Sequence, residues 1–320
     1  MDPLVSILIP CYNAEQWIAQ AIKSAEAQTW PQKEIIVIDD GSTDHSLDII
    51  RQFDGRIRWK TTPNRGGNTA RNHLLELARG DWLQYLDADD WLMSSKIADQ
   101  LDFLANNPEV DVIYSPVSVQ FWSSENSMVV DNAIPCDPRD DIWVLLLRWR
   151  IPQTGGLLWR RQALVDVGGW NPNQPCCQDY ELYLRLLMSG KRYDYCPSAQ
   201  AVHRIWGDET VSRRNPLLLQ EHRLEVLRQA EEFLRRGHEL TERRLQALNQ
   251  TRFEIARIEW VARRDAAIQI IQNIKKSQPD FMPSASAAPG VYRLIYRLLG
   301  FDIAERIARF RRLTRAFAGA

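Results

Sequence analysis

The chain has 320 residues, of which 45% are hydrophobic and 25% charged, and its formal net charge is −1. This composition is typical of a soluble globular protein with one large or two modest domains, and it excludes collagen-like, disordered and disulfide-scaffold proteins. No stretch of eighteen uncharged apolar residues is present, which argues against a membrane-spanning helix.

The first hundred residues alternate between predicted strands and predicted helices. Short apolar runs predict strands at 4–9, 34–38, 56–60 and 82–86. Apolar residues at helical spacing predict helices at 14–27, 44–53, 67–79 and 94–106. Asn13 is the expected cap of the first helix. Strands that alternate with helices predict an α/β fold, with a doubly wound, mainly parallel sheet and flanking helices.

The rest of the chain divides by charge and pattern. Residues 1–210 hold 19 Lys and Arg against 29 Asp and Glu, whereas residues 211–320 hold 21 against 12. From Asn215 onward the pattern becomes helical, which predicts a C-terminal helical extension. We expect these parts: a first domain at 1–212, with halves 1–110 and 111–212, a helical extension at 213–278, a linker at 279–290 and a basic amphipathic helix at 291–320.

Unusual polar residues follow the predicted strands, at the point where each strand ends. They are Pro10, Tyr12 and Asn13; Asp39 and Asp40; Asn64 and Arg71; and Asp87, Asp89 and Asp90. Because parallel sheets bind ligands at the carboxyl ends of their strands, this order predicts one cleft.

Asp87-Ala88-Asp89 is the sharpest of these features. In extended backbone, residues two apart point the same way, so the two carboxylates would converge and repel unless a cation joins them. Mg²⁺ and Mn²⁺ suit such oxygen ligands and share them with substrate phosphates. The alternative is a solvated acidic turn before the helix that begins at Ser94.

Asp39, Asp40 and Asp179 each have a functional interpretation and a structural one. Asp39 and Asp40 leave a buried strand, where they could accept hydrogen bonds from a nucleobase or ribose, or simply cap the following helix. Asp179 begins an amphipathic helix, where it could cap the helix or act as a base. No GxxxxGK[ST] or GxGxxG motif occurs, so a P-loop NTPase or a Rossmann dehydrogenase lacks its central part.

Taken together, these residues resemble the inverting family 2 glycosyltransferases of GT-A fold. The matching segments are SILIPCYN at 6–13, EIIVIDDGSTD at 34–44, NRGGNTARN at 64–72, GDWLQYLDADD at 80–90, GGLLWRRQALVDVGGW at 155–170 and QDYELYLRL at 178–186. Their ordered set covers about residues 4–212, and the closest resemblance is to bacterial enzymes that build surface polysaccharide or modify lipid-linked glycans.

The resemblance implies roles for individual residues. Pro10, Tyr12 and Asp39 resemble the uracil and ribose site, with Asp40 as a lesser candidate, and Arg71 resembles the basic residue near the nucleotide. Asp87 and Asp89 match the metal-binding Asp-x-Asp, with Asp89 as the more direct ligand of Mn²⁺ or Mg²⁺. Asp179 matches the catalytic base. These eight residues together form the predicted site.

Two positions depart from the family pattern. The family usually has Glu-Asp where this chain has Gln178-Asp179. It often has Tyr-Arg-x-His near the end of the catalytic domain, and the same register here gives His203-Arg204-Ile205-Trp206. We therefore expect His203 to be a packed or surface residue rather than a metal ligand.

The implied activity is transfer of a sugar from a nucleotide sugar, expected to be UDP-linked, to a hydroxyl of a glycan or lipid-linked acceptor with inversion. One alternative is a sugar nucleotidyltransferase, although its usual Gly-rich loop is replaced here by residues 10–13. The second alternative is a non-catalytic scaffold that binds nucleotide sugars, which Gln178 and Trp206 favour. No nucleic-acid partner is expected.

The expected location is cytoplasmic. Five cysteines without a Cys-x-x-Cys pair favour a reducing compartment, and the N-terminus does not resemble a secretory signal. Residues 291–320 carry seven Arg against Asp302 and Glu305, beside an apolar stripe. Such a helix suits the inner face of an anionic membrane, or alternatively packs on the acidic catalytic body.

Overall fold

The computed structural model describes residues 2–105, 107–122, 127–130, 141–198, 200–206 and 215–318. The described residues up to 206, apart from Leu147–Trp149, form one compact unit, and Leu147–Trp149 with the residues from Asn215 on form a second. The predicted boundary at 212 lies outside the described residues. The domain limits therefore stay a prediction.

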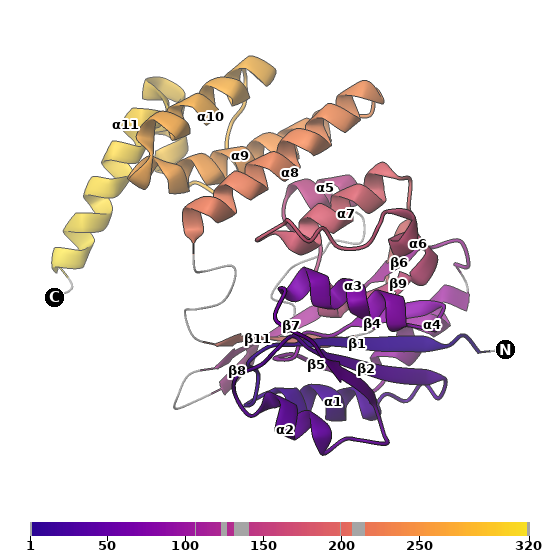
Figure 1. Cartoon of the computed structure of the whole chain (residues 1–320). Coiled ribbons are helices and arrows are strands. Elements are labelled where there is room, and N and C mark those ends of the chain that lie inside the picture. The colour runs from indigo at the N-terminus through magenta and orange to yellow at the C-terminus, as the bar shows by residue number, and fades with distance from the viewer. Residues whose placement is uncertain are drawn as a thin grey trace. The chain divides into compact units, whose positions relative to one another are not determined.

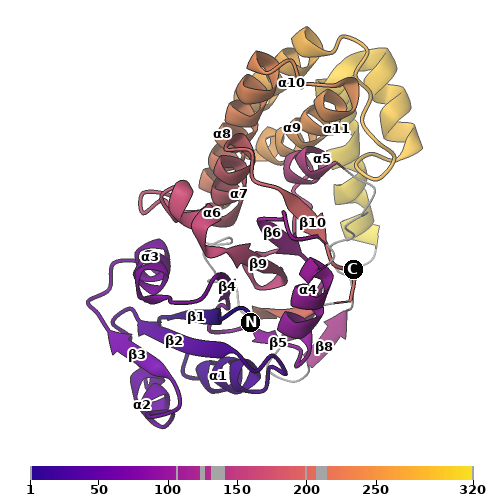
Figure 2. The ribbon, with the colours of Figure 1, turned by 90° about the vertical axis from the view of Figure 1, so that its right-hand side faces the viewer.

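A seven-stranded sheet forms the centre of the first unit, in the order β10-β6-β9-β4-β1-β2-β3 (Figure 2). Its strands are β1 (Val5–Cys11), β2 (Lys33–Asp39), β3 (Arg58–Thr61), β4 (Trp82–Tyr85), β6 (Val112–Tyr114), β9 (Leu157–Arg160) and β10 (Tyr193–Tyr195). All neighbours are parallel except β9, which runs antiparallel to β4 and β6. The predicted α/β fold with a mainly parallel sheet is confirmed.

Helices cover both faces of the central strands, which is why β1 and β2 are apolar almost without interruption. Helices α1 (Ile18–Glu26) and α2 (Ser46–Arg51) lie on one face of β1 and β2, and α3 (Gly67–Leu77) lies on the other (Figure 1). The other helices among the described residues up to 206 are α4 (Lys96–Ala105), α5 (Ile142–Leu147), α6 (Arg161–Asp166) and α7 (Gln178–Met188), with a 3₁₀ turn at Thr154–Gly156.

A second, smaller sheet was not expected from the sequence. It has the order β5-β11-β7-β8, with β5 (Trp91–Leu92), β7 (Val117–Trp122), β8 (Ser127–Val130) and β11 (Ala201–Trp206). β11 runs parallel to β7 and antiparallel to β5. β5 has only two residues, which are too few for a periodic pattern, and β11 mixes apolar, cationic and aromatic residues. The local sequence therefore predicts neither strand.

The predicted cap of the first helix is wrong. Asn13 has a φ of 48°, and its side chain accepts a hydrogen bond from the Thr43 amide at 2.8 Å, while α1 begins only at Ile18. Gly80 lies against β1, where an added Cβ would come within 2.6 Å of the Ser6 nitrogen. A side chain at position 80 would therefore displace the central strand.

The second unit consists mainly of α8 (Pro216–Arg236), α9 (Glu242–Ala262), α10 (Arg264–Ser277) and α11 (Gly290–Ala318). Asn215 caps α8, because its side chain accepts the Leu218 amide at 3.0 Å. Phe253 lies at the centre of the core, with ring centroids between 5.6 and 6.1 Å from its neighbours Phe281, Tyr292, Tyr296 and Phe301. The segment expected as a linker thus contributes Phe281 to this core.

The C-terminal helix is not continuous, in contrast to the single helix expected at 291–320. Gly300 has φ 82° and ψ 177°, which breaks α11 into two arms, 290–299 and 301–318. Only glycine adopts such backbone angles readily. None of the helices in the described parts of the chain is both long enough and apolar enough to cross a membrane.

Candidate active site

A cleft of about 440 Å³ lies in the first unit. Its lining comes from α3, from the turn after β4, from the segment 170–179 and from β11, and includes Arg71, Asp87, Asp89, Trp170, Asp179, His203 and Arg204. The structure therefore brings together four predicted site residues that are up to 108 positions apart in the sequence, namely Arg71, Asp87, Asp89 and Asp179. Pro10, Tyr12, Asp39 and Asp40 do not line this cleft.

Arg71 and Asp87 form an ion pair at one side of the cleft. The guanidinium Nη2 lies 2.7 Å from Asp87 Oδ1, and the guanidinium carbon lies 4.8 Å from the centre of the Trp170 ring. Burial lowers the pKa of Arg71, but Asp87 and Asp179 outweigh this effect and raise it. The cleft thus holds a buried cation that is fixed by Asp87 and influenced by the charge of Asp179.

Asp89 is a largely buried carboxylate in the turn after β4. Burial raises the pKa of Asp89 to about 7, and the charges of Asp90 and Asp87 add to the effect. A hydrogen bond from the Trp206 indole Nε1 to Asp89 Oδ2, at 2.9 Å, partly opposes it. Concentrated negative charge of this kind favours a bound cation.

The donors in the cleft fit a divalent cation that takes most of its ligands from elsewhere. Within the described residues, no group of three or more His, Cys, Asp or Glu side chains is arranged to hold a metal ion. Asp89, with Asp87 beside it, offers carboxylate oxygens of the type that Mn²⁺ and Mg²⁺ prefer. A diphosphate and water would have to complete the coordination shell.

Asp90, through its buried carboxylate, joins the turn after β4 to β11 and to Gln153. Its carboxylate accepts the Arg204 backbone amide at 2.8 Å, lies 3.2 Å from His203 Nδ1 and accepts Gln153 Nε2 at 2.9 Å. Burial lowers the pKa of His203, but Asp90, then Asp89 and Asp87, outweigh it and raise the pKa to about 9. His203 therefore contacts Asp90 while it lines the cleft, and its expected role as a packed or surface residue rather than a metal ligand stays a prediction.

Arg204 is a site residue that the sequence analysis missed. It is only 2% exposed, and its guanidinium carbon lies 4.1 Å from the ring centre of Trp17, 4.9 Å from that of Trp91 and 5.8 Å from that of Trp122. The same guanidinium donates to the backbone carbonyl of Asp89. An aromatic cage around this cation therefore fixes the turn that carries Asp89. The only sequence signal was an arginine among apolar residues.

Asp179 lies in the first turn of α7, at the positive end of the helix, and lines the cleft. Its Oδ1 accepts its neighbour's amide, that of Tyr180, at 2.9 Å. Burial raises the pKa of Asp179, although this amide and Arg71 oppose the rise. A carboxylate whose pKa is raised in a cleft is suited to take up a proton.

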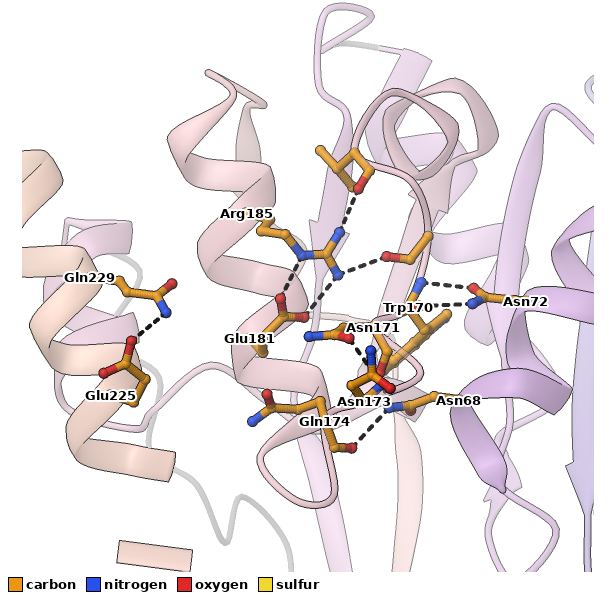
Figure 3. A network of polar contacts seen from close by, with 12 residues as sticks. Asn68, Asn72, Trp170, Asn171, Asn173, Gln174, Glu181, Arg185, Glu225 and Gln229 are labelled. Atoms are coloured by element: carbon orange, nitrogen blue, oxygen red, sulfur yellow. Dashed lines mark hydrogen bonds and ion pairs between the residues drawn. The ribbon is translucent and has the colours of Figure 1, made fainter. Parts of the chain in front are cut away.

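Amide side chains on α3 hold the segment that leads to Asp179 (Figure 3). Asn72 accepts the Trp170 amide at 2.8 Å and donates to the Trp170 carbonyl at 2.7 Å. Asn68 donates to the carbonyls of Asn171 at 2.7 Å and Gln174 at 3.1 Å. Gly169 permits this approach, because an added Cβ would lie 2.5 Å from Asn72 Oδ1.

A second clamp fixes the same segment from α7. Arg185 pairs with Glu181 at 2.7 Å and donates to the carbonyls of Val167 at 2.6 Å and Gly169 at 2.7 Å (Figure 3). The segment 167–174 is therefore held from both sides, which positions the first turn of α7 and with it Asp179.

The predicted nucleotide residues lie at the ends of β1 and β2. Asp39 is buried and accepts the Thr61 hydroxyl at 2.6 Å and the Ser42 amide at 3.2 Å. Asp40 is also buried and accepts the amides of Arg65 at 2.9 Å and Gly66 at 2.8 Å, which holds the loop before α3. Pro10 is half-buried and Tyr12 is 50% exposed. Nucleotide binding by these four residues stays a prediction.

Comparisons with known proteins agree on one family. Residues 6–164 match the family model described as Glycosyl transferase family 2. Over 191 residues the chain is 31% identical to the UDP-Glc:alpha-D-GlcNAc-diphosphoundecaprenol beta-1,3-glucosyltransferase WfaP of Escherichia coli, which covers 58% of this chain and 71% of that protein. Over 106 residues it is 40% identical to the putative teichuronic acid biosynthesis glycosyltransferase TuaG of Bacillus subtilis, covering 32% of this chain and 42% of TuaG.

Several other relatives are longer than the shared part. An uncharacterized glycosyltransferase of Haemophilus influenzae is 44% identical over 109 residues, which is 33% of this chain and 44% of that protein. Matches to two Rickettsia proteins cover 31% of each of them. The chain thus spans less than half the length of these first curated relatives.

Solved structures share the fold at low sequence identity. S. aureus TarS in complex with UDP-GlcNAc matches with a TM-score of 0.61 and 17% identity, over 97% of this chain and 92% of that one. The mannosyltransferase PcManGT from Pyrobaculum calidifontis, in complex with GDP-Man and Mn²⁺, matches with a TM-score of 0.53 and 18% identity, over 96% and 87% of the two chains.

Proposed function

Because this chain belongs to glycosyltransferase family 2 and has the GT-A fold, we propose that it transfers a sugar from a UDP-linked donor to a hydroxyl of a glycan or lipid-linked acceptor. The observation that carries the proposal is the cleft in which Asp179 lies with Arg71, Asp87 and Asp89. The names of two similar proteins support the substrate classes: TarS is in complex with UDP-GlcNAc, and WfaP is a UDP-Glc enzyme with a diphosphoundecaprenol-linked acceptor.

Asp179 is the base in this proposal. An acceptor hydroxyl next to its carboxylate would lose a proton as its oxygen attacks the anomeric carbon, and the bond to the UDP oxygen would break on the opposite face. One displacement of this kind inverts the anomeric centre. Burial raises the pKa of Asp179, which strengthens the carboxylate as a proton acceptor.

The opposite side of the cleft would receive the diphosphate. Arg71 offers a buried cation there, and its ion pair with Asp87 fixes its direction. Asp89, with Asp87, would hold Mn²⁺ or Mg²⁺ together with the diphosphate, and a bound cation would stabilise charge on the departing group. Pro10, Tyr12, Asp39 and Asp40 would contact the uracil and ribose from the ends of β1 and β2.

A product assay tests the proposal. Release of UDP is measured from UDP-Glc, UDP-GlcNAc and, as a comparison, release of GDP from GDP-Man, each with and without added Mn²⁺. The Asp179→Asn variant is compared with Asp102→Asn, which removes an exposed carboxylate on α4. Metal-dependent release by the parent chain and by Asp102→Asn, but not by Asp179→Asn, is expected. Tight UDP binding without turnover by any of them would favour a non-catalytic scaffold.

We also propose that the chain works at the anionic cytoplasmic face of a membrane, where a lipid-linked acceptor would be available. Both acidic residues of α11 are paired inside its own unit: Asp302 with Arg264 at 2.6 Å, and Glu305 with Arg257 at 2.5 Å. Arg297 and Arg309 are exposed. Such a surface suits anionic lipids, with about 1 kcal/mol per basic residue near the surface. Co-sedimentation of Arg297→Glu/Arg309→Glu with phosphatidylglycerol vesicles tests it, and undiminished binding would contradict it.

A further inference from the structure

Residues 151–156, called the linking segment below, contact both α7 and the turn after β4. Gln153 and Thr154 of this segment line the same cleft as Asp89 and Asp179. The segment ends in the 3₁₀ turn Thr154–Gly156 and leads directly into β9. All of its residues except Gln153 are buried, so its backbone groups need partners inside the protein.

The first part of the linking segment is held by α7. The Tyr180 hydroxyl donates to the Ile151 carbonyl at 2.8 Å, and the Tyr183 hydroxyl donates to the Pro152 carbonyl at 3.0 Å. Burial raises the pKa of Tyr183 well above its ordinary value, and the charge of Asp179 adds to this effect, so the hydroxyl keeps the proton that it donates. The segment is therefore tied to the helix that carries the proposed base.

The second part of the linking segment is held by the turn after β4 and by β4 itself. Gln153 Nε2 donates to Asp90 Oδ2 at 2.9 Å, while Gln153 Oε1 accepts the Gly155 amide at 2.9 Å. Gln84, on β4, donates to the Gly155 carbonyl at 3.1 Å. One side chain, that of Gln153, thus both begins the 3₁₀ turn and contacts the residue that follows Asp89.

The end of the linking segment is closely packed. An added Cβ at Gly156 would lie 2.6 Å from Val117 Cγ2 and 3.0 Å from the Ser115 carbonyl oxygen. Close-packed protein interiors have low compressibility and transmit strain. A displacement at the contact between Gln153 and Asp90 would therefore be passed along the segment to α7.

We propose that Gln153 is a positioning residue for sugar transfer, which fixes Asp89 relative to Asp179 by joining the α7-bound linking segment to Asp90. The inference rests on the proposed function and adds a residue to it. Gln153 acts through Asp90 in this proposal and does not need to touch the reacting atoms. Transfer should be sensitive to such a residue, because a misplacement of about 1 Å can cost about 10²-fold in rate.

Three variants test the two ends of the link. Gln153→Leu removes the hydrogen bonds to Asp90 and Gly155, whereas Gln153→Glu keeps an acceptor for the Gly155 amide and removes only the donor to Asp90. Tyr183→Phe removes the hydroxyl at the α7 end and keeps a ring against Trp159, whose ring centre lies 5.6 Å away. This small change keeps the test informative if Gln153→Leu disturbs folding.

Gln100→Leu is the matched control. Gln100 is a buried amide on α4 that donates to the Gly156 carbonyl at 3.2 Å and to Ser115 Oγ at 2.7 Å. It therefore contacts the end of the linking segment, but it is not part of the cleft lining. Its removal reports the effect of a lost buried amide without a change at Asp90.

The measurement is the steady-state rate of UDP release at saturating Mn²⁺, with whichever of UDP-Glc and UDP-GlcNAc the parent chain uses faster. Both Gln153 variants should lower kcat about tenfold or more and change the donor KM little. Tyr183→Phe should lower kcat in the same way. The double variant Gln153→Leu/Tyr183→Phe should be no slower than Gln153→Leu, because the two side chains belong to one link. Gln100→Leu should keep both constants near those of the parent.

Additive losses in the double variant would show that Gln153 and Tyr183 act independently, and would overturn the positioning role. Equal losses in Gln100→Leu and Gln153→Leu, parent-like rates in Gln153→Glu, or a raised KM with unchanged kcat would overturn it as well. With an active parent chain, each of these results leaves the proposed function intact. Absence of UDP release by the parent chain would instead remove the proposed function, and the positioning role with it.

Discussion

The indole nitrogen of Trp206 donates a hydrogen bond to Asp89 at 2.9 Å. Asp89 is the proposed metal ligand, and Trp206 occupies the register in which the resemblance to family 2 glycosyltransferases would place a histidine. An indole N–H can donate but cannot bind a metal. The residue at this position therefore orients the carboxylate, and His203, three positions earlier, pairs with Asp90 at 3.2 Å.

The metal requirement should follow this arrangement. Asp89→Ala is expected to lose metal-dependent activity, because Asp87 is already paired with Arg71. His203→Ala should change the Mn²⁺ concentration for half-maximal activity little, because the contact that the His203 ring makes is with Asp90. Mn²⁺ titrations of activity, and of UDP binding, check both. A large rise in the Mn²⁺ requirement of His203→Ala would show that the histidine reaches the metal.

Trp206→Phe should weaken Mn²⁺-dependent UDP binding while keeping the fold. The variant keeps the aromatic contact with Trp17, whose ring centre lies 5.9 Å away, but removes the donor to Asp89. Trp59→Phe is the matched control, because the Trp59 indole also donates to a carboxylate, that of Asp54 at 3.2 Å, and neither residue lines the cleft. UDP binding is measured by calorimetry with and without Mn²⁺. Equal effects of both substitutions would mean that the hydrogen bond has no special role.

Asp179→Asn should lower transfer by about 10²–10⁴-fold and leave UDP binding nearly unchanged. The parent enzyme should lose activity as the pH falls through the pKa of Asp179, which lies above the ordinary value of 3.8, because the base must be ionised. Rates measured across pH for the parent and the variant check this. Activity of Asp179→Asn within a few-fold of the parent would exclude Asp179 as the base.

The same substitution should also raise stability at neutral pH. Since the native state binds the Asp179 proton more tightly than the unfolded state, the free energy of unfolding falls as the pH rises from the unfolded to the folded pKa. Asparagine removes this cost. Thermal unfolding at neutral pH should therefore give a higher Tm for Asp179→Asn, and a clearly lower Tm would indicate that the carboxylate has a structural role.

Asn72→Ala should destabilise the first unit by about 1–3 kcal/mol, because it leaves the Trp170 amide and carbonyl without their partner. It should also lower kcat, since the segment that leads to Asp179 is released. The control Asn273→Ala removes an exposed amide on α10. Urea unfolding and steady-state kinetics of both variants separate the two effects, and unchanged kcat in Asn72→Ala would show that the clamp does not position the base.

Lys96 gives a prediction for the pH dependence of stability. It is fully buried against Gln84 and the Leu157 carbonyl, and burial lowers its pKa well below 10.5. Protons then bind the unfolded state more tightly, so stability falls as the pH drops below the unfolded pKa. Lys96→Met should flatten this slope in urea unfolding, whereas Lys60→Met, at an exposed position on β3, should leave it unchanged.

Much of this site could be predicted because its residues follow strands in a fixed order. Asp87 and Asp89 come directly after β4, and Arg71 lies on the helix before it, so the parallel topology alone brings them to one edge. Arg204 could not be predicted in this way. Its cage requires Trp17, Trp91 and Trp122. Trp17 precedes α1, and the pairing of β11 with β5 and β7 brings Arg204 to the other two.

Helix α3 serves both halves of the cleft at once. Arg71 faces Asp87, while Asn68 and Asn72, three residues before and one after it, hold the segment 170–174. A chimera that exchanges residues 1–110 with those of a relative would import a new α3 and break these contacts unless both asparagines came with it. For the proposed donor site, single substitutions should therefore disturb the first unit less than an exchange of residues 1–110.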